Sequence, residues 1–467
     1  MTANSIDESA AAFSSLALSP ALLATIESLN YQAMTPIQAQ ALPAVLDGRD
    51  ILAQAKTGSG KTLVFALGIL HKLQINHYHT QALVLCPTRE LAEQVSNEIR
   101  RLGRAIPNIK TTVLCGGRPL GPQTASLEHA PHIVVGTPGR ILKHLDSGSL
   151  KLDDVATCVL DEADRMLDMG FAEDILRIID MTPREKQTLL FSATFPHDIS
   201  RLRDKLQNNP LDVRVESLHD DKLIQQIFYQ VQTDERTAAL ISLLQHHRPQ
   251  SCVVFCNRKQ QCQDVADELV QRGFKTRALH GDLEQKERDQ ILVQFNNKSC
   301  TLLIATDVAA RGLDIKELHA VINYELTPDP SVHVHRIGRT GRAGSHGLAL
   351  SLFSVSEAPK LTAIETVQNG PVSIKEIPAP NSKTAYDLQP PMVTLSINAG
   401  RKDKIRAGDI LGALTANAAL SGDQIGKIDL YDKLAYVAVA RPIARQALNI
   451  LATGKIKGRK CRVQMLG

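Results

Sequence analysis

Residues 55–62 read Ala55-Lys56-Thr57-Gly58-Ser59-Gly60-Lys61-Thr62. An apolar run at residues 51–54 precedes them, and a longer apolar stretch at residues 63–70 follows. A glycine-rich turn between a strand and a helix is typical of a phosphate-binding loop, although the first glycine of the usual pattern is Ala55 here. Backbone N–H groups and the helix N-terminus can then surround phosphate oxygens. The stretch predicts an α/β nucleotide-binding domain.

The last two residues of this loop carry the charge chemistry. Lys61 can neutralise the β- and γ-phosphates of ATP, and the Thr62 hydroxyl can ligate Mg²⁺. The alternative is a glycine-rich turn that only precedes a core helix. The Gly-Lys-Thr ending in a strand–loop–helix context favours the phosphate loop.

A second apolar run, residues 155–160, ends in Asp161-Glu162-Ala163-Asp164. A carboxylate at a strand end beside a phosphate loop can hold Mg²⁺, and a second one can polarise the attacking water. We assign Asp161 to magnesium and Glu162 to the hydrolytic water. Alone, these acids would as readily form a surface cluster, but together with Lys61 and Thr62 they form a Walker B sequence.

Short apolar runs alternate with amphipathic stretches from residue 50 to residue 353, which predicts parallel sheets covered by helices. The expected strands are residues 82–86, 111–115, 133–136, 155–160 and 187–191, then 252–256, 275–279, 301–305, 320–324 and 348–353. The expected domains are a disordered N-terminus 1–12, a first lobe 13–208, an interlobe linker 209–224, a second lobe 225–370, a Pro-rich linker 371–391 and a C-terminal domain 392–467.

The phosphate loop and the acidic motif, with Ser192-Ala193-Thr194 and the stretch at residues 335–342, resemble the DEAD-box RNA helicases. The resemblance covers about residues 13–355. It implies two tandem RecA-like parallel-sheet lobes that close on ATP and RNA together.

The resemblance also implies nucleotide contacts outside the loop. Gln38 matches the residue that reads adenine, and Tyr31 matches a residue that stacks on the ring. Arg339 and Arg342 match arginine fingers for the γ-phosphate, and Asp314 a ribose contact. Ser192 and Thr194 would couple the nucleotide to RNA. On the residues alone, Gln38 would be an ordinary helix N-terminal residue, and the arginines a basic surface turn.

The implied RNA contacts lie at strand ends and helix starts, where hydroxyls, N–H groups and single arginines suit phosphate and sugar. Capping of the following helices is the alternative at each position, and both roles can coexist. The residues are Pro87, Thr88, Arg89, Gly117, Thr137, Pro138, Gly139 and Arg140 in the first lobe, and Gly281, Gln285, Arg288 and Thr306 in the second.

The C-terminal part is basic. Residues 393–467 hold thirteen Lys and Arg against five acids, whereas the whole chain has a net charge of only +4. Runs at 392–397, 406–417, 425–430, 434–440, 443–453 and 460–466 predict the βαββαβ order of a small α+β RNA-recognition-motif-like domain. The first strand has no aromatic residue and the third only Tyr436, so base stacking on the sheet is not expected.

The basic surface of this domain is the expected RNA contact, with a solvated positive face as the alternative. The residues are Lys455, Lys457, Arg459, Lys460 and Arg462. This stretch resembles the DbpA subfamily of bacterial DEAD-box proteins. That resemblance implies a 23S ribosomal RNA target, large-subunit precursor particles and ribosome assembly.

The chain has no apolar run of the roughly 18 residues that span a bilayer. Its eight cysteines form no CxxC pair, which favours reduced core residues and a cytoplasmic protein. The expected function is ATP-dependent local unwinding of RNA by a monomer, with no membrane partner. An ATP-gated RNA clamp or chaperone with little unwinding is the alternative, and a DNA helicase is a second rival.

Overall fold

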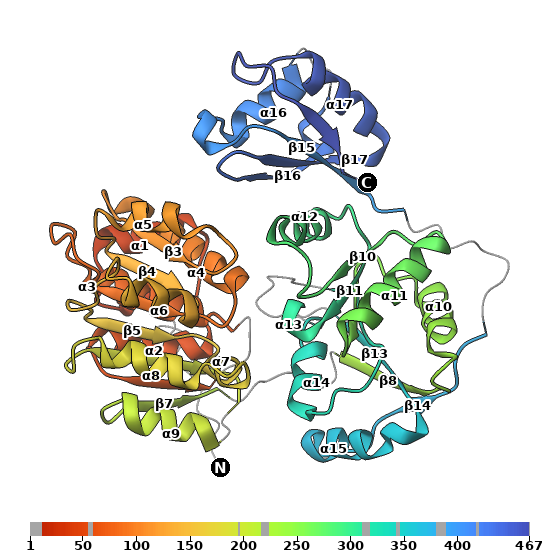
Figure 1. Ribbon diagram of the computed structural model, residues 1–467, viewed down its shortest axis with the longest axis horizontal. Coiled ribbons are helices and arrows are strands. Elements are labelled where there is room, and N and C mark those ends of the chain that lie inside the picture. Colours follow the sequence, from red (N-terminus) through yellow and green to blue (C-terminus); the bar gives the residue numbers. More distant parts are fainter. Residues whose placement is uncertain are drawn as a thin grey trace. The chain divides into compact units, whose positions relative to one another are not determined.

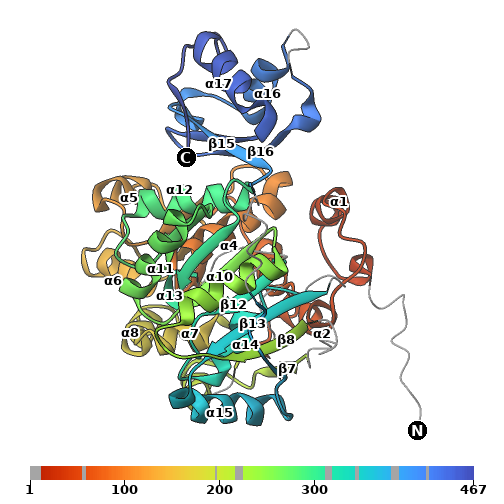
Figure 2. The ribbon, with the colours of Figure 1, turned by 90° about the vertical axis from the view of Figure 1, so that its right-hand side faces the viewer.

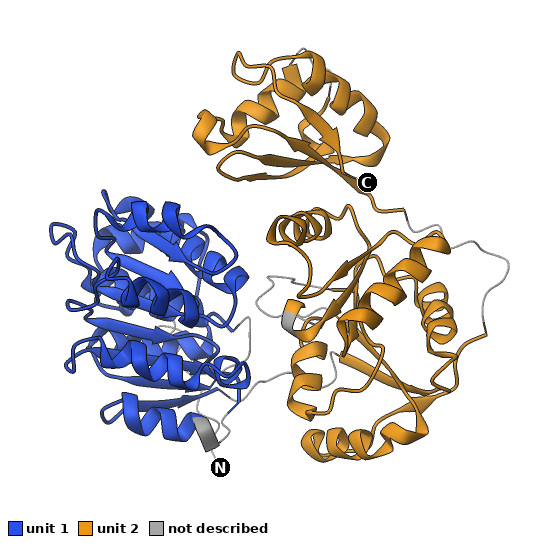
Figure 3. Cartoon of the chain, viewed as in Figure 1, with its two compact units in different colours: residues 1–218, 311–314 blue, residues 219–310, 315–467 orange. Residues whose placement is uncertain are grey.

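The computed structural model describes residues 12–54, 59–194, 197–215, 224–310, 318–341, 346–379, 389–416 and 420–466 (Figure 1). The chain divides into two compact units, residues 1–218 with 311–314 and residues 219–310 with 315–467 (Figure 3). The expected site residues that lie outside the described residues are Ala55, Lys56, Thr57, Gly58, Asp314 and Arg342.

The first unit, called the first lobe here, is built on a seven-stranded sheet in the order β3-β4-β2-β5-β6-β1-β7. All its strand pairs are parallel. The strands are β1 (Ile51–Gln54), β2 (Ala82–Leu85), β3 (Thr111–Leu114), β4 (Ile133–Gly136), β5 (Thr157–Leu160), β6 (Gln187–Ser192) and β7 (Leu211–Arg214).

Helices cover both faces of this sheet (Figure 1). Because successive side chains along a strand point to opposite faces, Ile51 and Ala53 enter one core and Leu52 enters the other. The first core is closed by α1 (Pro20–Ser28), α2 (Pro36–Leu46), α3 (Lys61–Lys72) and α4 (Arg89–Leu102). The second is closed by α5 (Leu120–Leu127), α6 (Pro138–Asp146), α7 (Ala163–Asp168), α8 (Ala172–Asp180) and α9 (His197–Leu206).

The second lobe repeats this topology. Its parallel sheet has the order β10-β11-β9-β12-β13-β8-β14, which is the order of the first sheet strand for strand. The strands are β8 (Ile224–Gln230), β9 (Cys252–Cys256), β10 (Thr276–Leu279), β11 (Leu302–Thr306), β12 (Ala320–Asn323), β13 (Gly347–Phe353) and β14 (Ile374–Lys375).

Helices also cover both faces of the second sheet (Figures 1 and 2). They are α10 (Arg236–His247), α11 (Lys259–Gln271), α12 (Gln285–Asn296), α13 (Asp307–Ala310), α14 (Pro330–Ile337) and α15 (Ala358–Gln368).

The C-terminal domain is a four-stranded antiparallel sheet in the order β16-β17-β15-β18 with two helices. Its elements are β15 (Met392–Ile397), α16 (Ala407–Thr415), β16 (Ile425–Leu430), β17 (Ala435–Ala440), α17 (Ala444–Thr453) and β18 (Val463–Met465). The expected βαββαβ order and the α/β fold class are confirmed.

The structure differs from the expectation at three strands. Leu211–Arg214 lies inside the expected interlobe linker but pairs with β1, and Ile224–Gln230 begins at its end and pairs with β13. Ile374–Lys375 lies in the expected Pro-rich linker and pairs with β8. These segments are polar or short, so their apolar signal in the sequence is weak. They form strands because their backbones pair with those of neighbouring strands.

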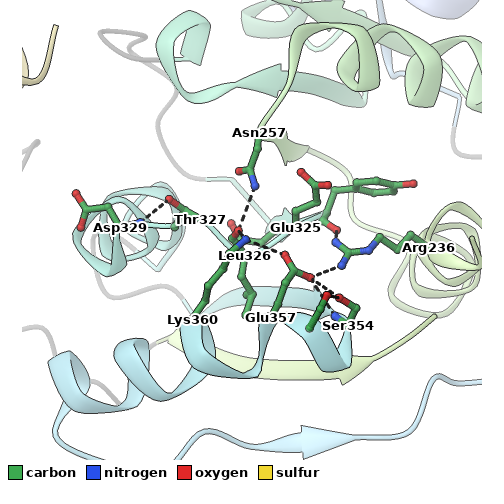
Figure 4. A network of polar contacts seen from close by, with 12 residues as sticks. Arg236, Asn257, Glu325, Leu326, Thr327, Asp329, Ser354, Glu357 and Lys360 are labelled. Carbon is green, nitrogen blue, oxygen red and sulfur yellow. Dashed lines mark hydrogen bonds and ion pairs between the residues drawn. The ribbon is translucent and has the colours of Figure 1, made fainter. Parts of the chain in front are cut away.

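A buried ion pair joins three elements of the second lobe (Figure 4). Arg236 at the start of α10 donates Nη1 to the Tyr324 carbonyl at 2.8 Å and pairs through Nη2 with Glu357. The Glu357 carboxylate also accepts the Ser354 N–H at 3.0 Å and pairs with Lys360 at 3.2 Å. Both partners are less than 10% exposed. Burial alone would raise the pKa of Glu357, but the Ser354 hydrogen bond and the Arg236 pair outweigh it and lower that pKa.

Glu357→Gln should lower the stability of the second lobe at pH 7 by about 3–5 kcal/mol, because Arg236 would stay buried without its carboxylate. A carboxyl group with a lowered pKa stabilises above its unfolded-state pKa, here about 4.5, and that stabilisation is lost as pH falls below it. The difference between wild type and variant should therefore stay constant from pH 7 down to about pH 4.5 and shrink only below that pH. Hydrogen exchange of peptides covering β12 and α15 measures it. The exposed Glu376→Gln is the control, and equal loss in both variants would contradict the prediction.

Candidate functional site

The parallel sheet of the first lobe brings the candidate residues that follow its strands to one edge, because the carboxyl ends of parallel strands lie together. The neighbours β5, β6 and β1 lead into the acidic motif, Ser192–Thr194 and the phosphate loop. The neighbours β3, β4 and β2 lead into Gly117, Thr137 and Pro87. Nucleotide and RNA candidates therefore occupy adjacent halves of the same edge.

The described end of the phosphate loop is held by α2. Thr35 donates Oγ1 to the Ser59 carbonyl at 2.8 Å, and Gln38 donates Nε2 to the Gly60 carbonyl at 3.2 Å. Gly60 has φ +94°, and a Cβ there would lie 2.3 Å from the Gln38 amide nitrogen, so glycine is required. The Gln38 oxygen accepts the Thr35 N–H at 2.8 Å. A carboxamide has two N–H donors and two lone pairs, so each end keeps one bonding position for an adenine edge.

Tyr31 is anchored at the same side of the first lobe. Its hydroxyl donates to Glu98 Oε1 at 2.9 Å, and the Arg101 guanidinium lies over its ring at 5.6 Å from the centroid. Phe13 meets it edge-on at a centroid distance of 6.3 Å. Burial, together with Glu98, raises the pKa of the Tyr31 hydroxyl. The ring is therefore held at a defined place beside α4.

Lys61 and Asp161 are both buried, and their opposite charges attract each other. Burial raises the pKa of Asp161 to about 6, although the Lys61 charge opposes the shift. Glu162 and Asp164 add to the rise because they are like charges. A bound divalent cation would favour the ionised form of Asp161, so this cluster has the electrostatics of a cation site.

Glu162 adopts a left-handed backbone conformation, φ 53°, that is unfavourable for a residue with a side chain. Its carboxylate forms a 2.8 Å ion pair with Arg165, and both side chains are buried. Such strain at a strand end is common at functional sites. Nothing in the sequence pattern singled out Arg165.

Two buried polar atoms at this edge have no hydrogen-bond partner among the described residues. They are Ser59 Oγ in the phosphate loop and Asp161 Oδ1 at the end of β5. A buried unpaired hydroxyl and a buried unpaired carboxylate oxygen are costly unless a ligand satisfies them. A phosphate oxygen would suit the first and a water of Mg²⁺ the second, so the residues present fit a magnesium triphosphate.

Asp164 links the acidic motif to the segment after β6. Its Oδ2 accepts the Ala193 N–H at 3.1 Å, the Thr194 N–H at 2.9 Å and the Thr194 hydroxyl at 2.9 Å. Ser192 donates to the Thr194 carbonyl at 2.6 Å, which closes the turn. The sequence pattern assigned no role to Asp164, because a third acid on the following helix has no distinct signal.

The RNA candidates of the first lobe include two helix starts and a glycine turn. Thr88 caps α4 by accepting the Leu91 N–H at 3.2 Å, so the capping alternative holds for this residue. Gly117 has φ +72°, and a Cβ there would lie 1.8 Å from Arg89 Nη1. The Arg89 guanidinium therefore lies directly over the glycine turn. Pro87 precedes Thr88, and Thr137, Pro138 and Gly139 begin α6.

Arg140, in the first turn of α6, is bound to the segment after β3. Its Nη1 donates to the Arg118 carbonyl at 3.0 Å and to Gln123 Oε1 at 3.1 Å. The guanidinium thereby joins the glycine turn to α6.

In the second lobe the RNA candidates follow β10 and β11, the counterparts of β3 and β4. Gly281 follows β10, Gln285 and Arg288 lie on α12, and Thr306 ends β11. Gln285 donates to Asp289 at 2.9 Å.

Arg336 organises the strand ends beside these candidates and was not predicted. It is 2% exposed and grips both carboxylate oxygens of Asp307 at 2.7 Å. It also donates to Asn257 at 2.8 Å and to Asn323 at 3.2 Å. Arg339, three residues on, is buried, and its carbonyl accepts the Leu318 N–H.

The basic residues of the C-terminal domain surround a tight turn. Ile456 and Arg459 exchange backbone hydrogen bonds of 2.9 and 3.0 Å across Lys457 (φ 49°) and Gly458 (φ 78°). Ile456 is buried in the domain core, whereas the five basic side chains are exposed. Lys457 lies 3.6 Å from Asp409, and Arg459 pairs with Asp403. The turn presents a compact positive surface with two of its charges partly balanced.

The outer face of the C-terminal sheet contacts the second lobe within the same unit. Thr394 hydrogen-bonds with Ser299 at 2.7 Å, and the Met392 N–H donates to the Lys298 carbonyl. Tyr436 is 2% exposed and hydrogen-bonds with Gln290 on α12. In this arrangement Tyr436 offers no surface for a base.

Three families match successive parts of the chain. Residues 35–202 match the DEAD/DEAH box helicases, residues 235–344 the helicase conserved C-terminal domain, and residues 394–465 the DbpA RNA binding domain. The matched regions cover both lobes and the C-terminal domain.

Two relatives are similar over nearly their whole length. The ATP-dependent RNA helicase DbpA of Escherichia coli is 51% identical over 97% of this chain and 99% of its own. Its Bacillus subtilis namesake is 35% identical over 97% and 98%. Among solved structures, Saccharomyces cerevisiae Dbp5 bound to RNA and ADP BeF3 is 29% identical, with a TM-score of 0.70 over 79% of this chain and 95% of that one.

Asp164→Ala should destabilise the edge of the first lobe by about 1–2 kcal/mol, because the part-buried donors of Ala193 and Thr194 would lose their acceptor. Faster hydrogen exchange in peptides covering β6 and Thr194 would report the loss. The exposed Glu173→Ala on α8 is the control. Unchanged exchange in the Asp164 variant would mean that the turn does not depend on this carboxylate.

Proposed function

The chain belongs to the DEAD-box ATP-dependent RNA helicases, with a DbpA-type RNA-binding domain, and from this premise we propose that it unwinds RNA locally during assembly of the large ribosomal subunit. The C-terminal domain would select 23S ribosomal RNA in precursor particles. The observation that carries the proposal is the single sheet edge where nucleotide and RNA candidates lie side by side.

The first lobe would bind ATP through its phosphate loop. Lys61 neutralises the β- and γ-phosphates, while Thr62 and Asp161 hold Mg²⁺, which, when bound, balances the phosphate charge. Gln38 reads the adenine edge and Tyr31 stacks on the ring. The loop residues that complete the cradle are Ala55, Lys56, Thr57, Gly58, Ser59 and Gly60.

Hydrolysis would need both lobes. Glu162 orients and polarises the attacking water, and the buried ion pair with Arg165 holds its carboxylate in place. Arg339 and Arg342 supply guanidinium groups to the γ-phosphate after closure, and Asp314 binds the ribose. Asp164 transmits the state of this site to Ser192 and Thr194.

RNA would be gripped by its backbone, since the candidates offer hydroxyls, N–H groups and single arginines. In the closed state the track fits a bent single strand and excludes a duplex, so ATP and RNA together shift the population toward local strand separation. The contacts are Pro87, Thr88, Arg89, Gly117, Thr137, Pro138, Gly139 and Arg140, then Gly281, Gln285, Arg288 and Thr306.

Targeting would come from the basic turn of the C-terminal domain. Its five exposed charges suit the phosphates of an RNA hairpin, and the sheet face is engaged by α12 instead. We further propose that the protein acts as a cytoplasmic monomer, with domain bounds as expected above except at the recruited strands. Its eight cysteines are free and buried, which suits a reducing compartment. No helix in the described part of the chain is long and apolar enough to cross a membrane.

Lys61→Ala should weaken ATP binding, whereas Glu162→Gln should leave binding intact and slow hydrolysis. Lys61 acts on ground-state phosphate charge, while Glu162 acts on the attacking water. Fluorescent-nucleotide titration and single-turnover hydrolysis separate the two effects. The glutamine variant should accumulate an ATP–RNA complex, and a duplex-displacement assay distinguishes the helicase from an ATP-gated clamp. If both variants lose nucleotide affinity equally, the two roles are wrongly assigned.

Replacing Lys455, Lys460 and Arg462 by glutamine should remove the preference for a ribosomal hairpin over an unrelated one. Loss of about three phosphate contacts should lower the log–log salt slope of binding by about 2–3. RNA-stimulated ATPase with both hairpins, at several salt concentrations, measures this. The control replaces Lys427, Lys433 and Arg445, three exposed positive charges elsewhere in the domain. A retained preference in the triple variant would refute targeting by the turn.

A further inference from the structure

One buried glutamine of the first lobe joins two of the segments assigned to RNA. Gln123 lies on α5, is 7% exposed, and is neither a nucleotide candidate nor an RNA candidate. Its carboxamide lies between the end of β3, which leads into the Gly116–Gly117 turn, and α6, which carries Arg140. A buried polar side chain in this position must have its hydrogen bonds satisfied.

The hydrogen bonds determine how the carboxamide is oriented. Nε2 donates to the Cys115 carbonyl at 2.9 Å. Oε1 accepts from Arg140 Nη1 at 3.1 Å and from His144 Nε2 at 3.0 Å, so both of its lone pairs are used. A glutamine reaches a carbonyl with one end and two donors with the other, which neither leucine nor a carboxylate can do.

His144 completes the arrangement from the far side of the carboxamide. It is fully buried, and its Nδ1 lies 2.8 Å from the Ser149 hydroxyl. Burial lowers the pKa of His144, and the Arg140 charge lowers it further. The ring is therefore neutral, with its proton on Nε2 facing Gln123 and Nδ1 accepting from Ser149.

These hydrogen bonds fix the orientation of the Arg140 guanidinium. Among the described residues, its hydrogen bonds to the Arg118 carbonyl and to Gln123 both use Nη1. A guanidinium has five N–H donors in a rigid plane, so holding one nitrogen orients Nε and Nη2. One acceptor, the Arg118 carbonyl, follows the glycine turn, and the other, Gln123, lies on α5, which ties the orientation of Arg140 to the glycine turn beneath Arg89.

We propose that Gln123 is a positioning residue for RNA binding: it holds the Arg140 guanidinium toward a backbone phosphate and locks α6 to the glycine turn. It touches no RNA itself. The inference depends on the proposed RNA role of Arg140. It predicts that the two residues act as one unit, whereas a glutamine that only stabilised the core would act independently of Arg140.

The test is a double-mutant cycle in the full-length protein. Arg140→Ala should weaken binding of a single-stranded RNA, in the presence of a non-hydrolysable ATP analogue, by about tenfold. Gln123→Leu should weaken it by several-fold, and the double variant should match Arg140→Ala within about twofold, because the lost interaction is shared. Thr124→Ala, an exposed neighbour on α5, should bind like wild type.

Gln123→Glu provides a second measurement if the leucine variant folds poorly, as judged by nucleotide affinity without RNA. It keeps the acceptor for Arg140 and loses the donor to Cys115, so its RNA affinity should lie closer to wild type than that of Arg140→Ala. If the affinity losses of Gln123→Leu and Arg140→Ala multiply in the double variant, the inference is overturned. It is also overturned if Gln123→Glu binds RNA as weakly as Arg140→Ala does. If Arg140→Ala binds RNA normally, the proposed RNA role of Arg140 fails first, and the positioning role with it.

Discussion

Parallel pairing of the strands is the constraint on which the rest of both lobes depends. In a parallel ladder every strand runs in the same direction, so every loop that leaves a carboxyl end opens on the same edge. The order β3-β4-β2-β5-β6-β1-β7 then decides which loops are neighbours. Segments as far apart in the chain as the phosphate loop and Ser192–Thr194 become adjacent because β1 pairs with β6. The second lobe repeats the order, so its candidate residues lie on the corresponding strands.

Loops on a common edge still need to be held together, and buried polar side chains do this. Asp164 joins the ends of β5 and β6, Gln123 joins the end of β3 to α6, and Arg336 joins the strand ends of the second lobe. Each of these side chains makes three or more hydrogen bonds, all of them at least partly buried. A ligand that moves one loop must therefore also move or break its hydrogen bonds with the next loop. Such connections are a physical means by which nucleotide binding could be coupled to RNA binding.

Sequence patterns predicted the architecture well, because buried parallel strands are short continuous apolar runs between glycine- and proline-rich loops. Residues 133–136 and 252–256 were predicted to the residue. β7 and β14 were not, since Leu211–Arg214 and Ile374–Lys375 are short strands at the sheet edge, the first with one buried core residue, Val213, and the second exposed. The patterns also did not predict the roles of Asp164, Arg165, Gln123 and Arg336. A polar residue on a helix has the same local sequence signal whether it faces solvent or a buried partner. Only three-dimensional neighbours distinguish the two.

The turn at Lys457–Gly458 places a lysine where the backbone favours glycine or asparagine, at a cost of about 1–2 kcal/mol. Asn-Gly would be the relaxed choice for two residues of positive φ. The domain accepts this strain and keeps a positive charge at the tip instead. Selection for thermal stability alone would therefore remove the lysine. The position marks where rigidity and affinity for a polyanion make opposite demands on a single side chain.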